Sequence, residues 1–336
     1  MLLRRMLHLN RALTFKIGRM GIIVCIIISC CYFCMRAPFK EYSGEERKER
    51  GTIARPVLPP FINMDSPIKH ARKYKLATCS IAKNMSTIMT ALFCFLMNSK
   101  AFVRANRTIP TESYFTRFCL HSNEHASIEA LLNSTKTTID DWTMIVVVRE
   151  PLERFLSGFL DKCVLNTVGH NVRDNCYGCG KDVGCVLERL YQRAWYYTSI
   201  PEATRNSFIN LEDYHFFPQN WHCSMQQYLP RYVTLKYSSD RRHRTETIHE
   251  IANVLQEANV PSNEIEYILR QTTSYTNHST VHSHDRLFYH DIITSSSRLL
   301  ELMYNIYYYD YAVFGYGFNY RDARPRMFKR PESSTH

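Results

Sequence analysis

Apolar runs of two lengths alternate along the chain and predict its secondary structure. The short runs predict strands over Lys75–Ala82, Tyr114–Leu120 and Met144–Val148. Longer stretches with apolar residues at helical spacing predict helices over Met85–Met97, Ile128–Leu132, Pro151–Leu165, Val183–Tyr197, Thr247–Glu257, Asn263–Gln271 and Ser297–Tyr309. Because strands alternate with helices, the pattern favours an α/β fold with a central parallel sheet flanked by helices.

The N-terminal region has a different pattern. Residues 20–35 form an uncharged apolar run, and five cations but no acidic residue precede it. This charge asymmetry predicts a single transmembrane signal-anchor with a cytosolic N-terminus and a lumenal remainder. A cleaved signal peptide is the alternative, but the run ends in Cys and Met without an Ala-x-Ala site, so we favour the anchor.

These features divide the chain into five parts. We expect a cytosolic tail over residues 1–19, the anchor over 20–35, a proline-containing lumenal stem over 36–72, a catalytic domain over 73–323 and a flexible tail over 324–336. With 45% hydrophobic residues, the 336-residue chain can bury one sizeable core.

Cysteine usage fits a lumenal domain. Eight cysteines lie outside the apolar run: Cys79, Cys94, Cys119, Cys163, Cys176, Cys179, Cys185 and Cys223. An even set in an oxidising compartment predicts disulfides, with the pairing left open. Cys176-x-x-Cys179 with Cys185 is also compatible with zinc, but a second Cys-x-x-Cys at finger spacing is missing, so we prefer a disulfide-pinned loop.

The chain is basic, with a formal net charge of +11. Removing the five cations of the N-terminal tail leaves about +6 for the rest, which suits an acidic polysaccharide or a multiply charged anionic donor. The predicted anchor excludes a nucleic-acid partner on topological grounds.

One segment carries the clearest chemical signal. The buried strand Ile145–Val148 ends on a cation, Arg149, and Pro151 then occupies a position suited to the first turn of a helix. Ser157 follows about two turns later. A strand-end arginine and a helix serine in this arrangement can converge on one phosphate.

Arg149–Ser157 resembles the 3′-phosphate-binding motif of Golgi carbohydrate sulfotransferases, specifically the chondroitin/dermatan 4-O-sulfotransferase type. The resemblance implies a P-loop-like sulfotransferase fold, the donor 3′-phosphoadenosine 5′-phosphosulfate, and binding of its 3′-phosphate by Arg149 and Ser157. The motif is long and combines charged, apolar and hydroxyl residues, so a chance match is improbable. Taken alone, it would also be compatible with a βα unit that carries a surface Arg–Glu pair and has no binding role.

A second segment, Ile81–Thr87, follows a strand and opens a helix, where backbone N–H groups and the helix dipole favour an anion. It resembles the 5′-phosphosulfate loop of sulfotransferases, which implies that the loop residues Lys83, Asn84, Met85, Ser86 and Thr87 bind the donor. The commonest form of the motif has Pro and a small residue where this chain has Ala82 and Met85, which indicates a divergent, nematode-like branch. A glycan on the Asn84 sequon would block this loop, so we predict that Asn84 is bare, whereas Asn106, Asn133 and Asn277 are plausible glycosylation sites.

Two downstream segments extend the resemblance in family order. His215–Cys223 resembles the family's His-x-x-Pro-Gln segment, and Tyr304–Tyr316 resembles its C-terminal aromatic ending. We expect Tyr304, Tyr308 and Phe314 to be core residues, since an aromatic stripe at helical spacing is usually core packing.

Sulfuryl transfer needs a cation for the leaving oxygen and a base for the acceptor hydroxyl. Lys83 is the candidate cation. His215, His121 and His125 are candidate bases, and His215 is preferred because it lies in a family-like segment. No metal is required, because fixed cations and positioning suffice.

The resemblance implies the 4-hydroxyl of N-acetylgalactosamine in chondroitin as the acceptor. Another glycan of heparan or N-glycan type, and a non-catalytic glycan-binding paralogue, are the alternatives. A metal-dependent glycosyltransferase would rest on Asp140-Asp141 alone. The chain has no G-x-x-x-x-G-K-[ST] motif, which argues against a nucleoside triphosphatase.

Overall fold

The computed structural model describes residues 55–112, 114–165, 175–273 and 284–318. The predicted cytosolic tail, the apolar run over 20–35, most of the stem and the tail over 324–336 lie outside these residues. Within the described ranges, no helix is both long and apolar enough to span a bilayer.

A five-stranded sheet organises the described part of the chain, in the order β3-β1-β2-β4-β5. Its strands are β1 Ile68–Ala71, β2 Leu76–Cys79, β3 Glu124–His125, β4 Thr143–Arg149 and β5 Tyr232–Tyr237. The strands β2, β4 and β5 run parallel, whereas β1 pairs antiparallel with both β2 and β3. The prediction of a parallel centre is thus correct, but the whole sheet is mixed.

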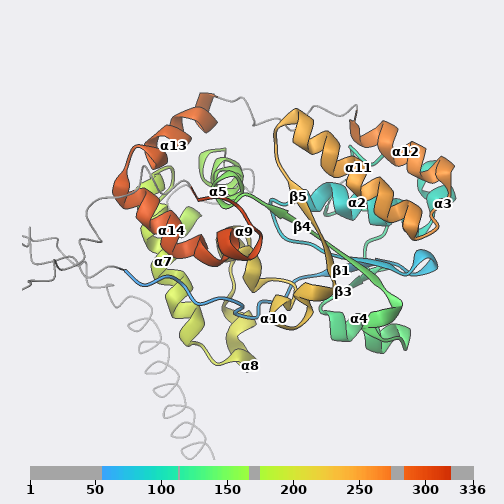
Figure 1. The fold of residues 1–336 in the computed structure, drawn as a ribbon, viewed down its shortest axis with the longest axis horizontal. Helices are drawn as coiled ribbons and strands as arrows, with labels where there is room; N and C mark the ends of the chain where they lie inside the picture. Colours follow the sequence, from blue (N-terminus) through green and yellow to red (C-terminus); the bar gives the residue numbers. More distant parts are fainter. Residues whose placement is uncertain (1–54, 113, 166–174, 274–283, 319–336) are drawn as a thin grey trace, which may run out of the picture. The chain divides into compact units, whose positions relative to one another are not determined.

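Helices cover both faces of this sheet (Figure 1). Alternate residues of β4 point to opposite sides, as a period of two requires. Ile145 and Val147 pack with α2 (Ser86–Met97) and the helices that follow β5. Met144, Val146 and Val148 pack with α4 (Ile128–Thr135) and α10 (Met225–Tyr228). A third apolar cluster joins α5 (Pro151–Phe159), α7 (Val183–Ser199) and α14 (Ser297–Val313). All seven predicted helices form, and five of them lie within four residues of the expected bounds. The helix predicted from Thr247 begins six residues earlier, at Arg241, and the helix predicted to end at Leu165 is α-helical only to Phe159.

The longer helices are α2 Ser86–Met97, α4 Ile128–Thr135, α5 Pro151–Phe159, α7 Val183–Ser199, α11 Arg241–Glu257, α12 Ser262–Thr273, α13 His284–Thr294 and α14 Ser297–Val313. The short ones are α3 Ser99–Arg104, α6 Asn175–Gly178, α8 Glu202–Arg205, α9 Leu211–Phe216 and α10 Met225–Tyr228. A π-helical turn over Leu160–Val164 continues α5.

The folded unit begins earlier than the sequence predicts. The sequence predicts a stem over residues 36–72, yet within it Leu58 and Met64 are buried and Ile68–Ala71 forms β1. The hydropathy pattern does not predict the strand β1, because a charged residue, Lys69, lies within it. That side chain is fully buried, and its charge is compensated by Glu124 at 3.2 Å.

The strand predicted over Tyr114–Leu120 is wrong, because the described residues of this segment form turns. Cys119 is bonded to Cys94 of α2, and the Phe118 amide donates to the Glu112 carboxylate over 2.9 Å, so neither joins a ladder. The strand β5 and the helix α13 were not predicted.

The aromatic stripe of α14 is rotated from the predicted one. Phe314 is buried as expected, but Tyr304 and Tyr308 are half-buried. Tyr307 and Tyr311 fill the core instead.

The eight described cysteines form four disulfides, which confirms the predicted class of bond. The pairs are Cys79–Cys223, Cys94–Cys119, Cys163–Cys176 and Cys179–Cys185. The two members of Cys176-x-x-Cys179 therefore bond to different partners within the pinned loop.

Candidate active site

The parallel strands β2, β4 and β5 end at one edge of the sheet, and the candidate site lies there. After β2, the chain turns through left-handed backbone at Lys83 (φ 69°) and Met85 (φ 60°) before α2 begins at Ser86. No side chain caps this helix, so its first N–H groups remain available as donors. Such an uncapped end favours an anion, and Ser86 and Thr87 add hydroxyls.

Lys83 projects from this loop to Asp161, on the π-helical turn after α5, and the two side chains form an ion pair. Burial lowers the pKa of Lys83, while the Asp161 carboxylate raises it. The positive charges of Lys162 and Arg149 add to the lowering. The lysine is therefore held among several charges at a fixed place in the loop.

Arg149, the last residue of β4, is 3% exposed and connects three segments. One guanidinium nitrogen, Nη1, donates to the backbone carbonyl of Lys83 over 3.1 Å. The nitrogen Nη2 donates to the Ser239 hydroxyl beyond β5, and Nε donates to Glu153 Oε2 over 3.3 Å. Arg149 therefore connects the Lys83 loop, the segment after β5 and the start of α5.

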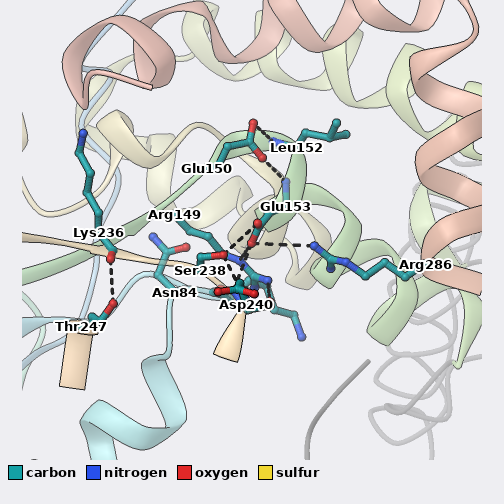
Figure 2. Close-up of polar contacts among 12 residues, drawn as sticks. Asn84, Arg149, Glu150, Leu152, Glu153, Lys236, Ser238, Asp240, Thr247 and Arg286 are labelled. Atoms are coloured by element: carbon teal, nitrogen blue, oxygen red, sulfur yellow. Dashed lines mark hydrogen bonds and ion pairs between the residues drawn. The ribbon is translucent and has the colours of Figure 1, made fainter. Parts of the chain in front are cut away.

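Donors from three elements converge on the Glu153 carboxylate, as Figure 2 shows. Besides Arg149, the Ser238 hydroxyl donates over 3.0 Å and the Ser239 amide over 3.3 Å. Arg286 of α13, whose side chain is 11% exposed, lies 3.9 Å from the same carboxylate. Two arginines, a hydroxyl and an amide are a donor set that suits a phosphate. Here the Glu153 carboxylate occupies these donors, so a phosphate could bind them only by displacing or sharing that carboxylate.

Ser157 lies on the same face of α5 as Glu153, because residues four apart on a helix are neighbours. Asp161 continues this row by another four residues. Ser157 is half-buried, and its hydroxyl makes no hydrogen bond to any residue within the described ranges. Ser157, which the sequence predicts to bind the phosphate, thus lies between Glu153, the partner of Arg149, and Asp161, the partner of Lys83.

His215 lies on α9, which packs tightly against α5. A Cβ on Gly158 would lie 2.9 Å from the Phe216 ring, so only glycine allows this approach without a shift. The Nδ1 atom of His215 lies 2.7 Å from the Leu211 carbonyl oxygen. Because a carbonyl only accepts, Nδ1 carries the proton and Nε2 carries the lone pair.

The pKa of His215 is lowered to about 4, mainly by burial. The positive charges of Lys83, Lys162 and Arg154 contribute to this lowering, whereas the hydrogen bond to Leu211 opposes it. The imidazole is therefore neutral at physiological pH. A neutral ring with Nε2 unprotonated is the form that a general base requires.

The other two candidate histidines have different surroundings. His121 is exposed in the turn after Cys119. The ring of His125 lies 4.9 Å from the His70 ring on the adjacent strand, and its Nδ1 atom lies 3.4 Å from the Ser134 hydroxyl of α4. Within the described residues, neither histidine contacts the Lys83 loop.

Asn84 and Met85 shape the loop with their side chains. Asn84 is 2% exposed and donates to the Val147 carbonyl over 3.0 Å and to Gln219 Oε1 over 2.6 Å. Met85 packs against the cluster around α2. The Asn84 amide is therefore inaccessible to modification in the folded protein, and the prediction that it carries no glycan stays a prediction.

Sequence reasoning missed several members of the site: Arg154, Asp161, Ser238, Ser239 and Arg286. Arg154 is buried in α5 and donates to the Ala82 and Phe217 carbonyls. Its position in the Arg149–Ser157 motif was the signal for it. The serines would have followed from recognising β5, since they come directly after that strand.

The acidic pair Asp140-Asp141 serves local structure. Asp141 accepts from the Thr138 amide at the start of a short 3₁₀ turn, and Asp140 forms an ion pair with Arg231. Among the described residues, no group of three or more potential metal ligands is assembled.

Comparisons with known proteins agree with this geometry. Residues 66–317 match the model of the sulfotransferase family, and this range includes β1. The chain is 32% identical over 277 residues to carbohydrate sulfotransferase chst-1 of Caenorhabditis elegans, with 81% of each chain covered. It is also 32% identical over 228 residues to putative sulfotransferase vep-2 of the same nematode, covering 67% of this chain and 68% of that protein. No solved structure matches it.

The chain therefore belongs to the sulfotransferase family, and it is a distant homologue of nematode carbohydrate sulfotransferases. Membership of this family implies 3′-phosphoadenosine 5′-phosphosulfate as the sulfuryl donor.

Proposed function

We propose that this protein transfers a sulfuryl group from 3′-phosphoadenosine 5′-phosphosulfate to a hydroxyl of a glycan, namely the 4-hydroxyl of N-acetylgalactosamine in chondroitin. The observation that carries the proposal is the placement of two cations at adjoining strand ends. Lys83 lies in an uncapped helix-opening loop, and Arg149 donates to the backbone of that same residue.

The donor site has two halves. Lys83, the N–H groups at the start of α2 and the hydroxyls of Ser86 and Thr87 would hold the 5′-phosphosulfate. Arg149 and Ser157 would hold the 3′-phosphate. Asn84 and Met85 take part through the loop backbone that they shape.

When bound, the donor supplies an activated sulfur whose bridging oxygen leaves with the 5′-phosphate. The acceptor hydroxyl oxygen forms the new S–O bond as the bridging S–O bond breaks. The Nε2 atom of His215 takes the hydroxyl proton, and the Lys83 ammonium stabilises the charge that develops on the leaving oxygen. The nucleotide product is 3′-phosphoadenosine 5′-phosphate.

We place the protein in the Golgi membrane as a single-pass type II protein with a lumenal catalytic domain. The apolar run over residues 20–35 and its preceding cations support this topology. Four disulfides among the described residues support an oxidising compartment. The acceptor is supported by the family resemblance and by the basic charge of the chain.

The test uses the full chain, purified in detergent from secretory cells, with labelled sulfuryl donor and desulfated chondroitin, dermatan, heparan and N-glycans. Label in chondroitin is the expected result, and disaccharide analysis should then place it at the 4-position. Label in another glycan alone would overturn the acceptor. Binding of the product nucleotide without label in any glycan would overturn the enzymatic proposal in favour of a glycan-binding paralogue.

A further inference from the structure

The side chain of Gln219 is inserted at the end of β4, where it is fully buried and all its polar positions are used. Its Oε1 accepts from the Arg149 amide over 2.9 Å and from Asn84 Nδ2 over 2.6 Å. Its Nε2 donates to the Arg149 carbonyl over 2.8 Å and points to Asp310 Oδ2 at 3.4 Å. One amide therefore contacts both halves of the candidate donor site.

These side-chain hydrogen bonds continue the backbone pairing of β4 past the point where the adjacent strand β2 ends. The strand β2 ends at Cys79, which pairs with Val146, so the last residues of β4 have no strand on that side. Asn84 takes the Val147 carbonyl there, and Gln219 takes both backbone groups of Arg149. Two side-chain amides thus replace the missing strand, and they hold the donor loop against the strand end.

Asp310 of α14 fixes Gln219 in turn. The aspartate is fully buried and accepts from the Gln219 amide over 2.7 Å and from the Asn220 amide over 2.8 Å. It also accepts from the Asn220 side chain over 2.6 Å. Both carboxylate oxygens act as acceptors here, which is the role of the ionised form.

We propose that Gln219, held by Asp310, is a positioning residue that sets the Lys83 loop and Arg149 at a fixed spacing. The inference rests on the proposed donor site and deepens it. The two phosphates of one nucleotide can be held together only if the two halves of the site keep that spacing. Loss of Gln219 therefore weakens recognition of the 3′-phosphate even though Arg149 itself is intact.

The experiment measures the affinity of the full chain for adenosine 3′,5′-bisphosphate and for adenosine 5′-monophosphate by calorimetry. The ratio of the two affinities reports the contribution of the 3′-phosphate. We expect Gln219→Ala and Asp310→Asn to lower this ratio by about tenfold, the size of a charged hydrogen bond that is no longer well placed. Gln256→Ala, on the exposed face of α11, is the matched control and should leave the ratio unchanged.

A double-mutant cycle separates positioning from general destabilisation. If Gln219 acts through Arg149, then Gln219→Ala should lower the ratio much less in an Arg149→Ala background. The inference would be overturned if folded Gln219 and Asp310 variants kept the wild-type ratio of the two nucleotide affinities. It would also be overturned if the double variant lost the product of the two single-variant factors, since the residues would then act independently.

Folding is checked by thermal unfolding, and Gln219→Glu serves as a shape-conserving second variant. If every Gln219 and Asp310 variant fails to fold, the pair acts in stability and the inference is wrong. Failure of the wild-type protein to bind the bisphosphate would instead overturn the proposed donor site.

Discussion

The guanidinium of Arg149 donates a hydrogen bond of 3.1 Å to the backbone carbonyl of Lys83. The candidate residue for the 3′-phosphate therefore directly supports the loop that would hold the 5′-phosphosulfate. A change in either half of the donor site should be felt in the other, so each substitution needs two readouts.

Lys83→Ala should lower kcat by about 10²–10³-fold, as expected for loss of a preorganised charge beside a leaving group. Donor affinity should fall much less, because the N–H groups of α2 and Arg149 remain. Steady-state kinetics together with nucleotide binding would separate the two effects. The control is Lys100→Ala, an exposed lysine of α3. Equal losses in kcat and in donor affinity would assign Lys83 to uniform binding instead.

Arg149→Ala should weaken binding of 3′-phosphorylated nucleotides by about 10–100-fold, which corresponds to a lost charge-assisted hydrogen bond. Affinity for adenosine 5′-monophosphate should also fall, because the hydrogen bond to the Lys83 carbonyl is lost, but by a much smaller factor. Ser157→Ala should act in the same direction with a smaller effect, because it removes one neutral donor. A similar loss for both nucleotides in Arg149→Ala would make the arginine structural.

Glu153→Gln should leave Arg149 and Arg286 without their shared carboxylate and destabilise the fold by about 1 kcal/mol, because the group is partly exposed. Added phosphate should then stabilise this variant more than the wild type, since an external anion can take the vacated place. Thermal unfolding with and without phosphate would measure this, with Glu246→Gln on α11 as the exposed control. An equal phosphate effect in all three proteins would contradict the interpretation of the cluster.

His215 should make stability depend on pH below neutrality. Burial lowers its pKa to about 4, whereas in the unfolded chain it titrates near the usual value of 6.5. Between these values the unfolded state binds more protons, so the free energy of unfolding should fall as pH falls from about 6.5 towards 4. Urea unfolding of wild type and His215→Gln across this range should show a weaker pH dependence in the variant.

The same histidine should set the acidic limb of the pH–rate profile. If Nε2 of His215 is the base, kcat/KM should decline only as pH approaches about 4, and His215→Gln should lose most turnover while still binding the product nucleotide. A variant that keeps turnover would remove His215 from this role.

The Cys79–Cys223 disulfide joins the end of β2 to a segment 144 residues later. Replacing both cysteines by alanine should cost about 2–4 kcal/mol of unfolding free energy. The Cys179–Cys185 bond spans only 6 residues and should contribute less, which makes its double-alanine variant the matched comparison. Urea unfolding would rank the two, and a larger loss for the shorter loop would be the contrary result.

The elements that sequence predicts well are those whose pattern is local. The strand β4 is a run of branched apolar residues, and α2, α5 and α7 carry helical periodicity over many residues. By contrast, β1 contains a buried lysine whose partner Glu124 lies far along the chain. The segment Tyr114–Leu120 has strand composition, but its side chains and its disulfide hold it in turns.

The same division applies to the site. Lys83, Arg149 and Ser157 belong to continuous motifs and could be selected from sequence. Arg286 could not, because only the packing of α13 brings it to within 3.9 Å of Glu153. Gln219 lay in a recognised segment, but its role depends on where β2 ends relative to β4.

The burial of Asn84 means that folding and N-glycosylation compete for the same side chain. Its covering residues, Val147 and Gln219, are synthesised long after it. In a chain that enters the secretory pathway, the Asn84-Met85-Ser86 sequon is presented to the glycosylation machinery before those partners exist. Any copy that acquires a glycan at this position cannot close its loop against β4, so the yield of competent protein depends on how rarely the nascent chain is modified there.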